Sequence, residues 1–149
     1  MSNNDDELPH ALTLEVRDTC LCLHVRRAAR AVARFYDDAL RPVDLTSGQF
    51  SLMMSLNRPE PPTMAQVSAV LALDRTTLTA NLKPLVRRGL VDVAIDAKDR
   101  RSRRMSLTEE GRRTLAAAMP LWRAAQAATE RLIGGADVGR LRRDLLALS

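Results

Sequence analysis

The apolar residues between positions 63 and 107 change from a helical spacing to a strand spacing, and this change constrains the fold more than any other feature. Thr63 and Gln66 form the pattern of a capping box that begins a helix. After a short turn, Asp74 is a good N-cap for a second helix, which Gly89 can end in a left-handed conformation. The apolar residues of this second helix that are predicted to face the core are Leu78, Leu82, Leu85 and Val86.

A β-hairpin is predicted directly after these two helices. Val91, Val93 and Ile95 alternate with polar or small residues up to Asp96, which indicates a strand with one buried face. The charged stretch 97–101 is predicted to turn, and residues 104–107 alternate again as the return strand. A helix-turn-helix followed by a hairpin is the order of a winged helix.

Helices are predicted on both sides of this segment. We expect one long amphipathic helix over about residues 14–40, a short helix over 46–57, and two further helices after Thr108 and after Gly135. The fold class is therefore mainly α, with a winged helix-turn-helix at residues 46–114. We expect a flexible tail at 1–10 and a helical dimerisation region at 11–45 and 115–149.

The positive charge of the chain is local. The 149 residues carry a net charge of +5, from 23 Lys and Arg against 18 Asp and Glu. Residues 75–104 contain nine Lys or Arg and three Asp, a net of +6, so the rest of the chain sums to about −1. A basic stretch that coincides with a predicted helix-turn-helix favours a nucleic-acid partner.

The sequence lacks the signals that mark several other classes of protein. No apolar run is long enough to span a membrane, and the acidic start lacks the pattern of a signal peptide, so we expect a cytoplasmic protein. Cys20 and Cys22 project in different directions from a helix and are not expected to pair. No glycine-rich phosphate loop or nucleophile elbow is present, so we expect no catalytic residues and no cofactor. A thiol peroxidase that uses Cys22 is the least implausible enzyme.

The residue types on the second helix suit the major groove of double-stranded DNA. Hydroxyls bond bases or phosphates, asparagine can grip adenine, and basic side chains neutralise phosphates. Pro84 is tolerable because the N-terminal part of such a helix reads the bases. The residues predicted to face outward and contact DNA are Arg75, Thr76, Thr77, Thr79, Asn81 and Lys83.

The predicted hairpin tip is the second expected contact. It contains Arg100, Arg101 and Arg103 and has no apolar residue to bury. An arginine at such a tip can enter the minor groove, where the potential is most negative. Asp99 is expected to pair with Arg101 and to fix the direction of its side chain.

Two motifs make the chain resemble the MarR family of bacterial regulators. They are LDRTTLTANLKPLVRRGLV at 73–91 and DAKDRRSRRMSLTEEGRR at 96–113. The resemblance implies a homodimer joined by its first and last helices, a pseudo-palindromic operator, and repression that a signal relieves. It also implies that Arg101 enters the minor groove with Asp99 orienting it. Pro84 departs from the commonest family pattern.

The sequence leaves several alternatives for the signal that relieves repression. Cys22 and Tyr36 are similar in spacing to the reactive cysteine and a tyrosine of family members that sense organic hydroperoxides, although Arg26 and Ser47 replace two further tyrosines. An inert, packed Cys22 is the alternative. Arg26 and Arg30 share a helix face and could bind a small anionic or aromatic effector, or form ion pairs instead.

Two weaker hypotheses complete the set. Cys20 and His24 lie four residues apart, but no further cluster completes a metal site, so we expect no bound metal. A non-specific architectural or RNA-binding module would bind unrelated sequences with equal affinity, whereas a regulator prefers its operator.

Overall fold

A computed structural model describes residues 8–149, which form two compact units that we describe separately. The first unit ends at Arg34 and the second runs over Phe35–Ser149. Most of the predicted tail lies outside the described residues, and a helix begins at His10. The division into a dimerisation region (11–45 and 115–149) and a DNA-binding domain (46–114) stays a prediction.

The first unit is helical, but the predicted single helix is wrong. Helix α1 covers His10–Thr19 and helix α2 covers Leu21–Leu40, the last turns of which belong to the second unit. Cys20 separates them because its backbone is extended, with φ −69° and ψ 110°. Its sulfur accepts a hydrogen bond from the Leu23 N–H at 3.4 Å, so it takes the role of an N-cap for α2.

No side chain between residues 8 and 34 is buried within this chain. Five apolar side chains of α1 and α2 are exposed there: Leu12, Val16, Leu21, Val25 and Val32. Contiguous exposed apolar residues on a helix are typical of a surface that another molecule covers.

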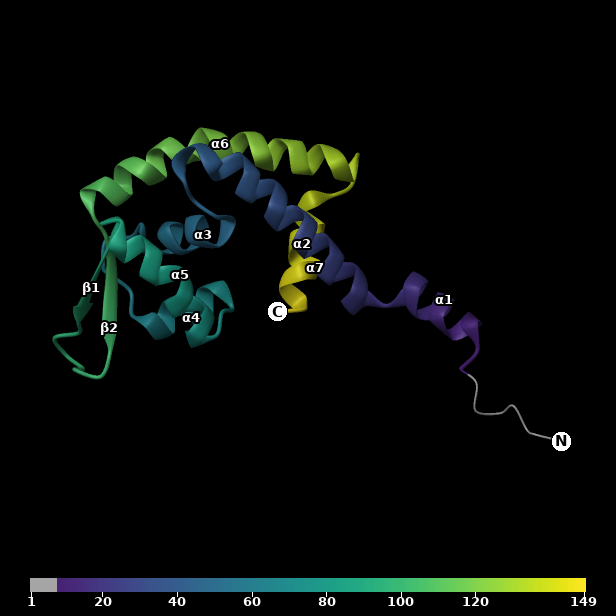
Figure 1. Cartoon of the computed structure of the whole chain (residues 1–149), viewed down its shortest axis with the longest axis horizontal. Coiled ribbons are helices and arrows are strands. Elements are labelled where there is room, and N and C mark those ends of the chain that lie inside the picture. Colours follow the sequence, from purple (N-terminus) through teal and green to yellow (C-terminus); the bar gives the residue numbers. More distant parts are fainter. Residues whose placement is uncertain (1–7) are drawn as a thin grey trace. The chain divides into compact units, whose positions relative to one another are not determined.

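The second unit begins with three short helices after the 3-10 turn Arg41–Val43. They are α3 (Ser47–Leu56), α4 (Met64–Leu71) and α5 (Arg75–Arg87), which Figure 1 shows grouped on one side of α6. Capping boxes begin α3 and α4, from Thr46 with Gln49 and from Thr63 with Gln66. The local signals that predicted these starts are confirmed.

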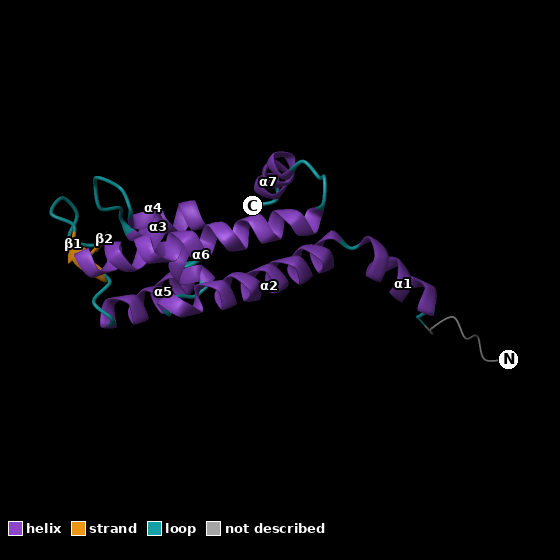
Figure 2. Cartoon of the chain, turned by 90° about the horizontal axis from the view of Figure 1, so that it is seen from above, coloured by secondary structure: helices purple, strands orange, loops and turns teal. Residues whose placement is uncertain are grey.

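The predicted hairpin is confirmed as the two strands drawn in orange in Figure 2. Strands β1 (Val91–Ile95) and β2 (Arg103–Leu107) pair antiparallel, with Val91 opposite Leu107. Gly89 has a φ of +70° and ends α5, and the Leu90 N–H then donates to the Leu85 carbonyl at 3.0 Å. The left-handed glycine thus lets the chain leave the helix and enter β1 directly.

One hydrophobic core joins these elements to the long helix α6 (Glu109–Ile133), which α7 (Val138–Ala147) follows. Of the four α5 residues predicted to face the core, three are buried. Val86 is 41% exposed, so that prediction is wrong. The largest fully buried side chains of the core are Leu40, Leu52, Met53, Val67, Leu78, Leu85, Val91 and Met105.

Candidate nucleic-acid interface

The start of α5 is held by a double contact from its N-cap. The Asp74 carboxylate accepts the Thr77 backbone N–H at 2.8 Å and the Thr77 hydroxyl at 2.9 Å. These hydrogen bonds hold the pKa of Asp74 below its ordinary value. The helix N-terminus, at which Arg75 and Thr76 are both exposed, is therefore fixed in place.

The structure separates the predicted α5 contacts into two groups. Arg75, Thr76 and Lys83 are exposed. Thr79 is half-buried, and its hydroxyl donates back to the Arg75 carbonyl at 2.8 Å. Asn81 is also half-buried, and its amide lies where a Cβ on Gly48 would meet it at 3.5 Å. Within residues 8–149, the side chains of the first group are exposed and form no hydrogen bond or ion pair.

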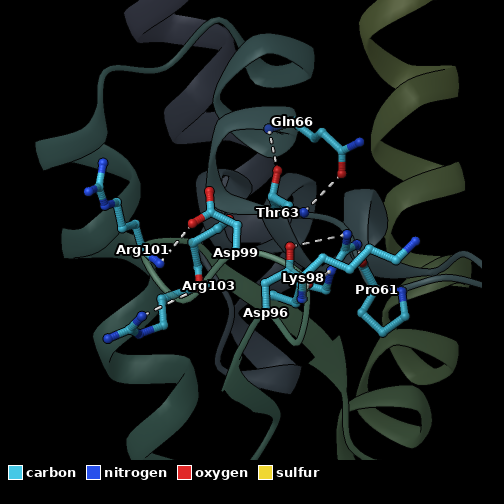
Figure 3. Close-up of polar contacts among 10 residues, drawn as sticks. Pro61, Thr63, Gln66, Asp96, Lys98, Asp99, Arg101 and Arg103 are labelled. Carbon is cyan, nitrogen blue, oxygen red and sulfur yellow. Dashed lines mark hydrogen bonds and ion pairs between the residues drawn. The ribbon is translucent and has the colours of Figure 1, made fainter.

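The tip of the wing is organised by Asp99, in a different way from the predicted one (Figure 3). Its carboxylate accepts the backbone N–H of Arg101 at 3.0 Å, and its carbonyl accepts the Ser102 N–H at 2.9 Å. Within residues 8–149 the Arg101 guanidinium forms no ion pair with Asp99. Asp99 therefore fixes the backbone of the turn, and the Arg101 side chain extends freely from it. Arg103 folds back and donates to the Arg100 carbonyl at 3.2 Å.

Three of the predicted basic residues line one hollow. Its volume is about 420 Å³, and it lies between α4, the start of α5 and the wing tip. Arg75 lines it from α5, and Arg101 and Arg103 line it from the wing. Residues more than 25 positions apart in sequence thus bring their positive charge to the same concave surface.

An ion pair at the point where β1 leads into the turn of the wing was missed by the sequence analysis. Asp96 is buried, and its carboxylate lies 3.1 Å from Nε of Arg104. Arg104 also donates from Nη1 to the Pro61 carbonyl at 2.6 Å, and the Met105 N–H donates to the Pro62 carbonyl at 3.0 Å. The wing is thereby tied to the loop that leads into α4 (Figure 3).

The hairpin register explains this contact. Arg104 is opposite Ala94, so Asp96 and Arg104 are diagonal neighbours on one face of the hairpin. The sequence signal that could have predicted this ion pair is an acidic and a basic residue at diagonal positions of the hairpin. The Arg104 hydrogen bond, and secondarily the Lys98 backbone N–H, hold the pKa of Asp96 below its ordinary value of 3.8.

The residues predicted to sense a signal belong to both units. Cys22, Arg26 and Arg30 are exposed on the part of α2 that belongs to the first unit. Tyr36 belongs to the second unit, where its hydroxyl donates to Gln126 at 2.6 Å. The sensing roles of these four residues stay predictions.

The described residues contain neither a metal-binding cluster nor a membrane-spanning helix. His24 bonds the Cys20 carbonyl through Nδ1 at 2.7 Å. Among residues 8–149 no three His, Cys, Asp or Glu side chains gather as a metal site. No helix in that part of the chain is long and apolar enough to cross a membrane.

The fold and the basic surface define a winged helix-turn-helix protein. The pattern of the winged helix DNA-binding domain matches residues 45–111. The transcriptional regulator MosR of M. tuberculosis, solved in complex with DNA, is 43% identical, with a TM-score of 0.78 over 87% of this chain and 93% of that chain. A regulator of the MarR family from Rhodococcus sp. RHA1 is 26% identical, with a TM-score of 0.70 over 83% of this chain and 88% of that one.

The chain belongs to the MarR family of winged helix-turn-helix regulators. The organic hydroperoxide resistance transcriptional regulator of Bacillus subtilis (strain 168) is 31% identical over 91 residues, which are 61% of this chain and 62% of that protein. Another curated relative is covered over 49% of its length. The chain thus spans about half of one of these two curated relatives and 62% of the other.

Proposed function

We propose that the protein is a sequence-specific, DNA-binding transcriptional regulator that acts by binding and not by catalysis. One observation carries the proposal: Arg75, Arg101 and Arg103 line a single hollow between the helix-turn-helix and the wing. The N-terminal part of a recognition helix reads bases in the major groove, and an arginine on a wing suits the minor groove. MosR, which has the same fold, was solved with DNA.

We infer different roles for the side chains that form hydrogen bonds inside the protein and for those that do not. Arg75 and Thr76 contact base edges, and Arg101 enters the minor groove. Lys83, Arg100 and Arg103 neutralise phosphates, which contributes affinity without sequence preference. Since the hydroxyls of Thr77 and Thr79 donate inside the protein, each offers DNA only an acceptor. Asn81 supports α5 from its place beside Gly48.

A homodimer that binds a pseudo-palindromic operator completes the proposal. The exposed apolar side chains of α1, α2 and α7 are the surfaces that a second copy would cover. Two copies present two recognition helices, and the symmetry of the operator then mirrors that of the protein. Repression that a small-molecule or oxidative signal relieves is the mode of action that the resemblance to the MarR family implies.

Binding to the DNA upstream of the protein's own gene tests the proposal. At one fixed salt concentration, we expect a preference of at least roughly 10³ over unrelated DNA. Arg101→Ala should weaken operator binding by about 1–3 kcal/mol, because a specific contact is lost. Arg131→Ala, an exposed arginine in the last turn of α6, is the matched control and should bind normally. Equal affinity of the wild-type protein for all DNA sequences would indicate a non-specific architectural protein and refute the proposal.

Oxidation of Cys22 is the second candidate, as the signal that releases DNA. Its thiol is exposed on α2, and a relative is a regulator of organic hydroperoxide resistance. Exposed thiols are accessible to peroxide, which converts them to sulfenic acids. Cys22→Ser should keep full operator affinity and lose release by cumene hydroperoxide, whereas Cys20→Ser should still be released. Release of the Cys22→Ser variant by the peroxide would exclude Cys22 as the sensor.

A further inference from the structure

The basic side chains of this protein are unevenly divided between arginine and lysine. Of the 23 basic residues only two are lysines, Lys83 and Lys98, and both lie in the basic stretch 75–104. Lys83 is on α5, and Lys98 is in the turn between β1 and β2. Arginine stays protonated, whereas the lysine amine can be acylated. Acylation of lysine side chains in this chain therefore acts only on the winged helix-turn-helix.

Both lysine amines are accessible and make no polar contact within the protein. Lys83 and Lys98 are exposed, and within residues 8–149 neither ammonium group forms an ion pair or a hydrogen bond. Of Lys98 only the backbone N–H is used, as a donor to the Asp96 carboxylate at 3.2 Å. Conversion of either ammonium group to an amide therefore breaks no polar contact that holds the fold.

An exposed arginine accompanies each lysine. Arg87 follows Lys83 by four residues on α5, and side chains at this spacing are neighbours on a helix surface. Arg100 is exposed in the same turn of the wing as Lys98. A guanidinium binds phosphate through charge-assisted hydrogen bonds. In an acyl phosphate the carbonyl carbon is bonded to a phosphate oxygen, so arginine that holds the phosphate brings this carbon close to the lysine amine.

The transfer of the acyl group needs no other reactant. The lysine ammonium loses its proton to water, and the neutral amine attacks the carbonyl carbon. The C–N bond of the amide forms, the C–O bond to phosphate breaks, and inorganic phosphate leaves with the electron pair of that bond. Each transfer removes one positive charge, so two transfers lower the net charge of residues 75–104 from +6 to +4. Loss of charges that neutralise DNA phosphates weakens binding.

We propose that Lys83 and Lys98 are acylation sites for an acyl phosphate and that their acylation weakens DNA binding. The second part rests on the proposed function, and the first part does not.

Acetyl phosphate added to the full-length protein tests the first part, with mass spectrometry of peptides to locate and count the acetyl groups. We expect acetylation of both lysines at rates that fall as the salt concentration rises, because salt screens the attraction between the donor and the arginines. The control is N-acetoxysuccinimide, an uncharged donor, whose rate should not depend on salt. The same salt dependence for both donors would overturn recruitment by arginine.

Two arginine variants provide a matched comparison in which each lysine is the control for the other. Arg87→Gln should slow acetylation of Lys83 by at least about threefold, because a charge-assisted contact with the donor is lost, and should leave Lys98 unchanged. Arg100→Gln should slow Lys98 and leave Lys83 unchanged. Equal rates at each lysine in the wild type and in both variants would show ordinary surface reactivity and overturn the two sites.

The DNA arm compares operator binding before and after treatment with acetyl phosphate. The wild-type protein acetylated at both lysines should bind at least about fivefold more weakly and with a smaller salt dependence, because fewer phosphate contacts remain. The double variant Lys83→Arg, Lys98→Arg cannot be acylated at these positions, so treatment should not change its own affinity. It also controls for acetylation of the thiols of Cys20 and Cys22.

The outcomes separate the two parts of the proposal. Unchanged operator binding by the acetylated wild type, or an equal loss in the double variant, would overturn the effect on DNA binding. Acetylation that follows the expected pattern in a protein that binds no operator would refute the proposed function and retain the acylation sites.

Discussion

Gly111 is the residue that sets how closely α6 approaches the end of α5. A Cβ on Gly111 would lie 2.1 Å from the Leu90 carbonyl oxygen, which is a backbone atom that cannot turn aside. The same carbonyl accepts the Thr108 N–H at 3.1 Å, and the Thr108 hydroxyl caps α6 by accepting the Gly111 N–H at 3.0 Å. A side chain at position 111 must therefore separate α6 from the hairpin entry.

We expect Gly111→Ala to lower the free energy of unfolding by at least about 2 kcal/mol, because this overpacking is relieved only by moving backbone. Urea denaturation followed by circular dichroism measures the loss. Gly48→Ala is the control, since its Cβ would meet the Asn81 side chain at 3.5 Å, an ordinary contact. It should gain about 0.5–1 kcal/mol from helix propensity. Equal stability of the two variants would show that α6 can shift at no cost.

The contact between Asp99 and Arg101 at the tip of the wing differs from the predicted pairing of their side chains. Asp99 and Arg101 do contact each other, yet through the Arg101 backbone N–H. Sequence gives the identity of two groups but not the rotamer that one of them adopts. For the same reason, Asn81 was assigned to the outer face of α5, whereas it lies beside Gly48 and is half-buried.

At the scale of elements, the ion pair of Asp96 and Arg104 fixes the wing against the loop before α4. The folded-state pKa of Asp96 is lowered, so its contribution to stability is present above the ordinary pKa of 3.8 and is lost as the pH falls through the folded pKa. The ion pair between Asp96 and Arg104 is therefore intact at neutral pH and is lost only in acid.

We expect Asp96→Asn to be less stable than the wild type at pH 7, with the difference shrinking as the pH falls below the ordinary pKa of 3.8 toward the lower folded pKa, where the wild-type carboxylate becomes protonated. Denaturation curves at several pH values measure this convergence. Asp92→Asn removes an exposed carboxylate from β1 and should show no such convergence. A stability difference that stays constant with pH would mean that the charge of Asp96 contributes nothing.

Elements with local signals could be predicted from the sequence. The caps at Thr63 and Asp74 and the left-handed Gly89 each depend on neighbours within a few residues, and all were confirmed. The break at Cys20 was missed because the apolar period continues across it. An apolar cavity lined by Phe50 and Trp122 was missed because its walls come from α3, α4 and α6, and the packing of these helices is a property of the tertiary structure.

At the scale of the whole molecule, a single chain leaves many apolar side chains exposed to water. On α7, Leu141, Leu145 and Leu146 are 38%, 46% and 72% exposed. Burying such side chains is favourable by about 25 cal/mol per Å² of apolar surface. A second copy that covers them would also place a second wing and recognition helix on the same DNA, which raises affinity through the shared binding of two half-sites.

We therefore expect the wild-type protein to have a solution mass of about 33 kDa, twice the 16.5 kDa of one chain. Leu145→Glu should shift this mass toward 16.5 kDa, because a carboxylate cannot be buried in an apolar contact, and should weaken operator binding while helix content stays unchanged. Arg143→Glu introduces the same side chain at a polar position of α7 and should remain dimeric. Light scattering after gel filtration measures the masses. A wild-type mass of one chain at micromolar concentration would refute the dimer, and with it the pseudo-palindromic operator.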